Sequence, residues 1–140
     1  MVKAPPPRTS DEWARDKRVM PPASPVPGPF NPDSNPYMKP IAWAFAQPQY
    51  RRVTFVMGTQ MGKSVTMENV CGHRLDEDPT PVLSVTPTKP LITSTVEPKF
   101  MDMFRECADL WRKYDKRRST QFTKWLGGTK FRFAWAGSPT

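Results

Sequence analysis

The sequence predicts an α/β fold in which a layer of mainly parallel strands is joined by crossover helices. Strand-like segments at 51–57, 82–86 and 130–136 alternate with helix-like segments at 63–74 and 93–114. Two parallel strands need a long crossover connection, usually a helix, so this order favours parallel pairing. Three strands make an incomplete layer, and the loop between the first strand and the first helix is the feature that indicates a function.

The N-terminal part of the chain is rich in proline. Twelve of the eighteen prolines lie before residue 49, and they are densest at 21–29, where proline can neither continue a helix nor pair in a sheet. We therefore expect residues 1–35 to be a flexible, proline-rich segment and residues 36–140 to form the domain. Within the segment, Ser10 is the expected N-cap of a short helix over 10–18, with acids in its first turn and bases in its last.

The elements of the domain each have a local signal. Apolar residues spaced for a small helix occupy 36–47, which Pro48 ends. The β-branched and aromatic run at 51–57 is typical of a buried strand, and so is the short apolar run at 82–86. Charge and bulk alternate over 130–136 after a glycine turn, as they do in a half-buried strand.

Two longer helices connect these strands. Val65, Met67, Val70 and Cys71 share parts of an apolar face, so a helix is expected from 63 to 74. The strongest helical periodicity lies between 93 and 114, where the apolar positions are Val96, Phe100, Met103, Phe104, Cys107, Leu110 and Trp111. Each helix follows a predicted strand, as a crossover connection requires.

The formal net charge of +8 is concentrated in the last third of the chain. Residues 99–140 carry ten basic and four acidic side chains. The basic and aromatic stretch 111–118 suits a nucleic-acid backbone, but the solvated end of a helix has the same composition. Both interpretations stay open at this stage.

Other kinds of site lack support. Cys71 and Cys107 fall in predicted helices with no secretory leader before them, which favours reduced, buried thiols. Cys71 and His73 would lie on different helix faces without a second pair, so a metal site is not indicated. A single histidine with no nearby acid leaves little for acid–base catalysis, and no long apolar run predicts a membrane span. We therefore expect a cytosolic protein.

The strongest functional signal is the loop Gly58-Thr59-Gln60-Met61-Gly62-Lys63-Ser64, called loop 58–64 below. A loop that runs from a strand into a helix leaves backbone N–H groups unpaired where the helix dipole favours negative charge. Gly62 allows a close backbone approach, Lys63 can reach the β and γ phosphates, and Ser64 can offer its hydroxyl to magnesium. This is the division of labour of a Walker A loop, so we expect an incomplete P-loop NTPase-like layer with ATP and Mg²⁺ as cofactors.

The loop departs from the usual Walker A spacing. Met57 stands where the first glycine is expected, and Gly58 comes one place late, so a glycine turn with a surface lysine is the alternative. No catalytic residue is assigned, because hydrolysis also needs an acid at the end of another strand. The run 75–78 has suitable acids but lies at a helix end, where capping and solvation are the expected roles.

Loop 58–64, with glutamine two places before Gly-Lys, resembles the phosphate loop of the large terminase subunit of tailed phages, the lambda-type ATPase family. The segment 36–40, together with Pro48, resembles the family's approach to its first strand. The segment 78–88 resembles its second strand and Pro-Thr turn. Gly127-Gly128 and 136–139 resemble its Gly-Gly turn and Ser-Pro segment, so that the resemblance covers residues 30–140.

The resemblance implies a motor that uses ATP to package viral DNA into a procapsid, with a magnesium-dependent nuclease domain. The residues that match the family's nucleotide-contacting motif are Gly58, Gln60, Gly62, Lys63 and Ser64, with Ser64 also on the metal. The implied partners are double-stranded DNA, the terminase small subunit and the portal of the procapsid. The implied location is the host cytoplasm, with no membrane.

In this family the Walker B acid, the catalytic glutamate and the nuclease domain come later than residue 140. The expected protein is therefore the N-terminal portion of a terminase large subunit, from a truncated gene, a prophage remnant or a trimmed chain. The alternative function is a non-catalytic nucleic-acid or partner-binding module, in which the basic region 99–132 binds and Gly62-Lys63-Ser64 is incidental. An inactive prophage remnant is the third possibility.

Overall fold

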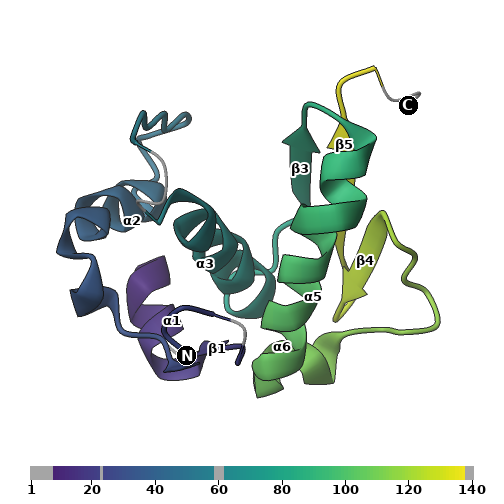
Figure 1. The fold of residues 1–140 in the computed structure, drawn as a ribbon, viewed down its shortest axis with the longest axis horizontal. Coiled ribbons are helices and arrows are strands. Elements are labelled where there is room, and N and C mark those ends of the chain that lie inside the picture. The colour runs from purple at the N-terminus through teal and green to yellow at the C-terminus, as the bar shows by residue number, and fades with distance from the viewer. Residues whose placement is uncertain (1–7, 23, 59–61, 138–140) are drawn as a thin grey trace, which may run out of the picture.

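The structure, a computed structural model, describes residues 8–22, 24–58 and 62–137. It is a mixed α/β arrangement with two sides (Figure 1). On one side lie three helices, which are α1 (Ser10–Lys17), α2 (Lys39–Ala46) and α3 (Lys63–Asp76). On the other side lies a small sheet, covered by α5 (Glu97–Glu106) and α6 (Ala108–Lys113). The α/β class predicted from the sequence is confirmed.

The sheet is mixed rather than mainly parallel. It contains β3 (Val82–Thr86), β4 (Thr123–Leu126) and β5 (Thr129–Trp135) in the order β3-β5-β4. β3 pairs with β5 in parallel, and β4 pairs with β5 in an antiparallel hairpin. The prediction of mainly parallel strands is wrong because Gly127 and Gly128, with φ of 58° and 84°, close a two-residue turn that reverses the chain.

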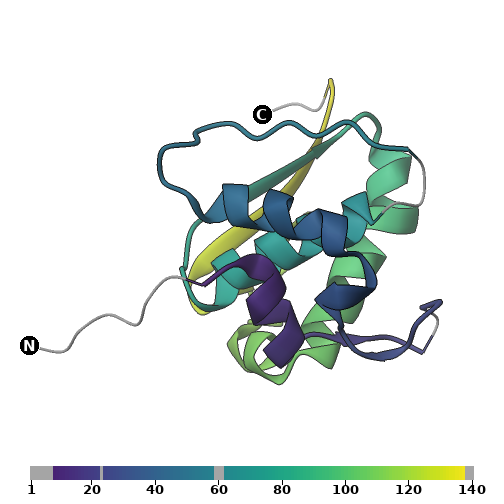
Figure 2. The same ribbon diagram turned by 90° about the vertical axis from the view of Figure 1, so that its left-hand side faces the viewer.

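The strand predicted at 51–57 is not present. Residues 52–58 have no regular secondary structure, although Val53, Phe55 and Met57 are half-buried and the residues between them are exposed. This alternation is that of a strand, but a strand needs a hydrogen-bonding neighbour, and none of the described strands pairs with this segment. The segment instead crosses above α2 (Figure 2), where the rings of Phe55 and Phe45 pack edge to face with their centroids 6.4 Å apart.

The long helix predicted at 93–114 is divided. The chain forms α4 (Lys89–Leu91), a π-helical turn (Ile92–Val96), α5 and α6 in succession. Cys107 separates the last two, with an extended backbone of φ −102° and ψ 110°. The break allows Phe104 of α5 and Leu110 of α6 to enter the same core.

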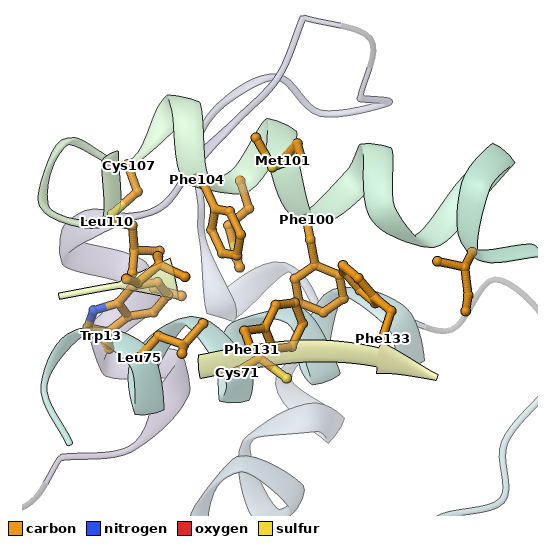
Figure 3. Close-up of a cluster of buried hydrophobic side chains, with 14 residues drawn as sticks. Trp13, Cys71, Leu75, Phe100, Met101, Phe104, Cys107, Leu110, Phe131 and Phe133 are labelled. Atoms are coloured by element: carbon orange, nitrogen blue, oxygen red, sulfur yellow. The ribbon is translucent and has the colours of Figure 1, made fainter. Parts of the chain in front are cut away.

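One hydrophobic core joins the two sides of the molecule (Figure 3). Trp13 of α1 and Leu75 of α3 meet Phe104 of α5 there. Phe100 and Phe131 pack with ring centroids 4.8 Å apart, which ties α5 to the central strand. The apolar positions predicted between 93 and 114 enter this core, except Trp111, which is 42% exposed, and Val96, which is partly buried.

Part of the proline-rich segment has regular structure. β1 (Val19–Met20) and β2 (Gly28–Pro29) form an antiparallel pair, followed by short 3-10 turns at Pro32–Ser34 and Pro36–Met38. The expectation that no proline of the run 21–29 pairs in a sheet is wrong for Pro29, because an edge strand tolerates a missing N–H group. The flexibility of 1–35 as a whole stays a prediction, and residues 1–7 and 23 lie outside the described part.

Helix α1 packs against α3 at very short range. A Cβ atom on Gly72 would lie 2.5 Å from Cη2 of Trp13, so only glycine permits this contact. The N-cap of α1 is Thr9, one residue earlier than predicted, and its hydroxyl accepts from the N–H of Glu12 at 3.4 Å.

No helix of the described residues is long and apolar enough to cross a membrane.

Asp76, at the end of α3, connects three helices. Its Oδ2 accepts from Nε1 of Trp13 and from Nζ of Lys17, both at 2.8 Å, and its Oδ1 accepts from Nζ of Lys113 at 2.6 Å. Burial alone would raise the pKa of this carboxyl, but the hydrogen bonds from Lys113, Lys17 and Trp13 outweigh it and hold the pKa at about 2. The prediction that residues 75–78 only cap the helix and face solvent is therefore wrong for Asp76, which α1 and α6 bury.

The substitution Asp76→Asn should lower the free energy of unfolding by about 2 to 3 kcal/mol at pH 7. The folded pKa lies below the value of about 3.9 for an unfolded aspartate, so this stability is present above pH 4 and is lost as the pH falls towards 2. Urea unfolding between pH 7 and 2 measures the difference between wild type and variant, which should narrow with acid.

The matched control for this prediction is Asp102→Asn. Asp102 pairs with Arg105 at 3.6 Å, and both side chains are half exposed, so its loss should cost less than about 0.5 kcal/mol at every pH. Equal losses in the two variants would contradict the assignment of a buried ionic centre at Asp76.

Candidate phosphate-binding site

The start of α3 has the backbone geometry of an anion site. Gly62 precedes the helix in the left-handed conformation, with φ 86° and ψ 13°, which an L-residue with a Cβ adopts only under strain. Its carbonyl accepts from the N–H of Thr66 at 3.0 Å, so the N–H groups of Lys63, Ser64 and Val65 come before the first bond of the helix. Among the described residues no side chain caps these groups. These N–H groups lie at the N-terminal end of a fourteen-residue helix, where the helix dipole is positive.

The Lys63 side chain folds back towards the backbone of residues 57 and 58. Its Nζ donates to the carbonyl oxygens of Gly58 at 2.5 Å and Met57 at 3.2 Å. These are neutral acceptors, and a phosphate oxygen would be a stronger one for an ammonium group. The side chain of Ser64 is exposed in the first turn of the helix. Gly58, Gly62, Lys63 and Ser64 therefore lie together, whereas Gln60 lies outside the described residues.

A pocket of about 740 Å³ opens onto this helix start. Another wall of the pocket comes from the N-terminal segment, with polar groups that include Ser10, Asn31 and Asn35. The hydroxyl of Ser10 is buried and has no hydrogen-bond partner among the described residues. This wall was not predicted, because residues 10 to 42 carry no motif and reach the site only through tertiary packing.

The charged groups that line the pocket are mostly positive. Lys39, Lys63 and Lys99 contribute three cations, and Asp11 contributes one carboxylate. Lys39 is already paired with Asp33. The excess of positive charge favours an anionic ligand over a neutral or cationic one.

The acidic run 75–78 lies at the opposite end of α3, about 20 Å along the helix axis from loop 58–64. Glu77 pairs with Arg8 at 2.5 Å, and Asp78 is exposed and pairs with Arg74. These acids cannot reach a ligand at the start of the helix.

No group of histidine, cysteine and acidic residues in the described ranges could hold a metal ion. Cys71 and Cys107 are free and buried, and burial raises the pKa of the Cys71 thiol to about 12. Burial also lowers the pKa of His73, which lies next to Trp13 with ring centroids 6.5 Å apart. Cys71, Cys107 and His73 are therefore assigned to packing and not to metal binding.

Because no such group of side chains lies at Ser64 in the described ranges, a magnesium ion there would need phosphate oxygens and water as its other ligands, which is usual for this ion.

The basic stretch 111–118 forms a separate surface. The guanidinium of Arg118 lies 3.9 Å from the centre of the Trp125 ring, and Trp111 stacks on Tyr114 with centroids 5.2 Å apart. Arg117 and Lys116 beside them are exposed. This surface combines cations with aromatic faces, which are the two features that contact single-stranded or duplex nucleic acid.

The fold and the site together define an α/β protein in which a glycine-led, lysine-bearing helix start faces a positively charged pocket. A family model described as "Phage terminase large subunit gpA, ATPase domain" matches residues 24–140. The chain belongs to this family, and the resemblance noted from loop 58–64 and its flanking segments is confirmed. Comparisons with curated proteins and with solved structures find no match.

The substitution Gly62→Ala should weaken the binding of an anion at the helix start. The new Cβ meets Nδ2 of Asn35 at an ordinary 3.6 Å, so the cost comes from the backbone, at about 1 to 2 kcal/mol, and is relieved by turning the first amides away from the pocket. Calorimetric titration with pyrophosphate and thermal unfolding measure the two effects.

Gly128→Ala is the matched control, because Gly128 has φ 84° and an added Cβ would meet nothing within 4 Å. It should lower stability by a similar amount and leave pyrophosphate binding unchanged. An equal loss of binding in both variants would show that the effect follows stability and not the geometry of the helix start.

Proposed function

We propose that this chain binds the phosphates of ATP through loop 58–64, a deviant Walker A loop, as part of the DNA-packaging motor of a tailed phage or prophage. The observation that supports this most directly is the start of α3, where Gly62 leaves three helix amides uncapped beside the ammonium group of Lys63. The family of the chain is an ATPase domain of terminase large subunits, which implies the use of a nucleotide.

Lys63 and Ser64 of the loop have distinct proposed roles. Lys63 exchanges the carbonyl oxygens of Met57 and Gly58 for phosphate oxygens, because charged acceptors form the stronger bonds. Ser64 offers its exposed hydroxyl to Mg²⁺. When bound, the ion neutralises charge on the phosphates. Gln60 is included on the family resemblance alone.

The pocket gives room for more than a phosphate. Its volume of about 740 Å³ falls inside the range of roughly 300 to 1,000 Å³ that small-molecule sites occupy. A nucleoside attached to a phosphate at Gly62 would extend towards the wall formed by Asn31 and Asn35, whose amides can bond to sugar or base. This favours a nucleotide over a free inorganic anion.

The proposed partners follow the family. They are double-stranded DNA, the terminase small subunit and the portal of the procapsid, all in the host cytoplasm. The surface of Arg118 and Trp125 is the described region best suited to contact DNA. The same surface favours the alternative function, a non-catalytic nucleic-acid-binding module in which Gly62-Lys63-Ser64 is incidental.

The substitution Lys63→Ala should weaken the binding of magnesium-ATP by roughly 10- to 100-fold, which is the usual loss for a hydrogen bond to a charged group. Lys130→Ala is the control, since Lys130 is an exposed lysine of β5 that does not line the pocket. Isothermal titration calorimetry measures the affinity, and phosphate release is followed on the same samples.

The outcomes separate the two functions. Binding by wild type and Lys130→Ala, with loss in Lys63→Ala, supports the nucleotide site. A folded wild type that binds DNA but not magnesium-ATP would contradict it and favour the alternative module. Phosphate release by the wild type would require a catalytic acid among the 140 residues, where none is assigned.

A further inference from the structure

Helix α1 lies outside the region that matches the family, which begins at residue 24. It nevertheless packs against α3, whose first residues form the proposed phosphate site (Figure 2). The residue that follows α1 is Arg18, and it is only 4% exposed. A buried arginine so close to a ligand site needs an explanation, because burying a cation is costly.

Arg18 binds the first two turns of α3. Its Nη1 donates to Oδ1 of Asn69 at 2.6 Å and to the carbonyl oxygen of Val65 at 3.2 Å. Its Nη2 donates to Oε2 of Glu68 at 2.6 Å, and both members of this ion pair are buried. The carbonyl of Arg18 also accepts from the N–H of Phe30 at 3.0 Å, which attaches the hairpin β1–β2.

These contacts specify a position more than they add stability. A buried ion pair recovers little beyond its own desolvation cost, and Nε of Arg18 is buried without a partner among the described residues. The guanidinium, however, is a planar fork of N–H donors, so its acceptors must lie in fixed directions around it. Val65 and Asn69 are one helical turn apart, so the fork fixes the rotation of α3 about its own axis.

We propose that Arg18 is a positioning residue for the phosphate site, which sets the rotation of α3 so that Lys63 and the free amides of its first turn face the pocket. The proposal rests on the proposed function, since it needs a phosphate at this helix start. It also gives helix α1, which the family match does not include, a role in the site, because α1 carries Arg18 at its C-terminal end. The hairpin that lines the pocket is held by the same residue through Phe30.

The other end of α3 supplies a control for stability alone. Trp13 bonds to Asp76 and packs on Gly72, at the C-terminal end of the helix and away from Lys63. Trp13→Phe removes that hydrogen bond and part of the core packing, and it changes neither Arg18 nor the residues to which Arg18 bonds. It should lower the melting temperature at least as much as Arg18→Met does, because Trp13 is fully buried in the core.

The experiment compares wild type, Arg18→Met, Arg18→Lys and Trp13→Phe by calorimetric titration with magnesium-ATP and by thermal unfolding. Arg18→Met should weaken binding by roughly 10-fold, the size usual for a lost supporting contact. Arg18→Lys, which keeps the positive charge but loses the planar fork of the guanidinium, should recover part of the loss. Trp13→Phe should bind within about 2-fold of wild type despite its lower melting temperature. If Arg18→Met does not fold, Arg18→Lys beside Trp13→Phe makes the same comparison.

Two results would overturn the proposal. Wild-type affinity in a folded Arg18→Met variant, or in Arg18→Lys where Arg18→Met does not fold, would show that Arg18 is purely structural. An equal loss in Trp13→Phe would show that binding follows global stability. Absence of binding by the wild type is a different result, because it removes the proposed function itself and the role of Arg18 with it.

Discussion

The close packing of α1 on α3 is the contact on which the rest of the molecule depends. Gly72 lets the Trp13 ring approach the backbone of α3, and the indole N–H then reaches Asp76. Because Asp76 also binds Lys17 and Lys113, the same point fixes α6 and the sheet side of the core. A larger residue at position 72 would separate these elements, since protein interiors have no spare room for a shifted indole.

The small sheet is covered on one face only. Phe131 and Phe133 of β5 point into the core under α5, as Figure 3 shows. On the other face Leu83 and Val85 of β3 are 60% and 64% exposed. Most residues of the buried core lie on the covered face of the sheet and on the helices α5 and α6 that cover it, and α1 and α3 add Trp13, Ala14, Cys71 and Leu75.

Local signals in the sequence were sufficient for some elements. The helix from Lys63, the strand Val82–Thr86 and the glycine turn before β5 each depend on neighbouring residues, and all three are present. The segment 51–57 has equally strong strand character but no partner, and strand propensity describes a half-buried, paired surface. Pairing between distant segments cannot be read from a short stretch of sequence.

The candidate site also has one part that a local motif predicts and another part that only tertiary packing brings together. Loop 58–64 is contiguous, so its residue types, together with the predicted strand before it and the predicted helix after it, led to the phosphate-binding hypothesis. Of these two flanking elements the structure has the helix and not the strand. The wall of the pocket at Ser10 and Asn35, and the support from Arg18, arise from contacts over more than twenty residues of sequence. Nothing in the composition of residues 10 to 35 predicts that they face the loop. The burial of Arg18 beside a proline-rich run likewise depends on the tertiary fold, because no local pattern marks that arginine as different from its neighbours.

The most direct test of a nucleotide site at the start of α3 is a map of the backbone amides that respond to magnesium-ATP in NMR spectra of the whole chain. The largest shifts should fall on Gly58 and on 62–66, with smaller shifts along the pocket wall at 31–35. Shifts confined to 111–118, or scattered without a centre at the start of α3, would contradict the site.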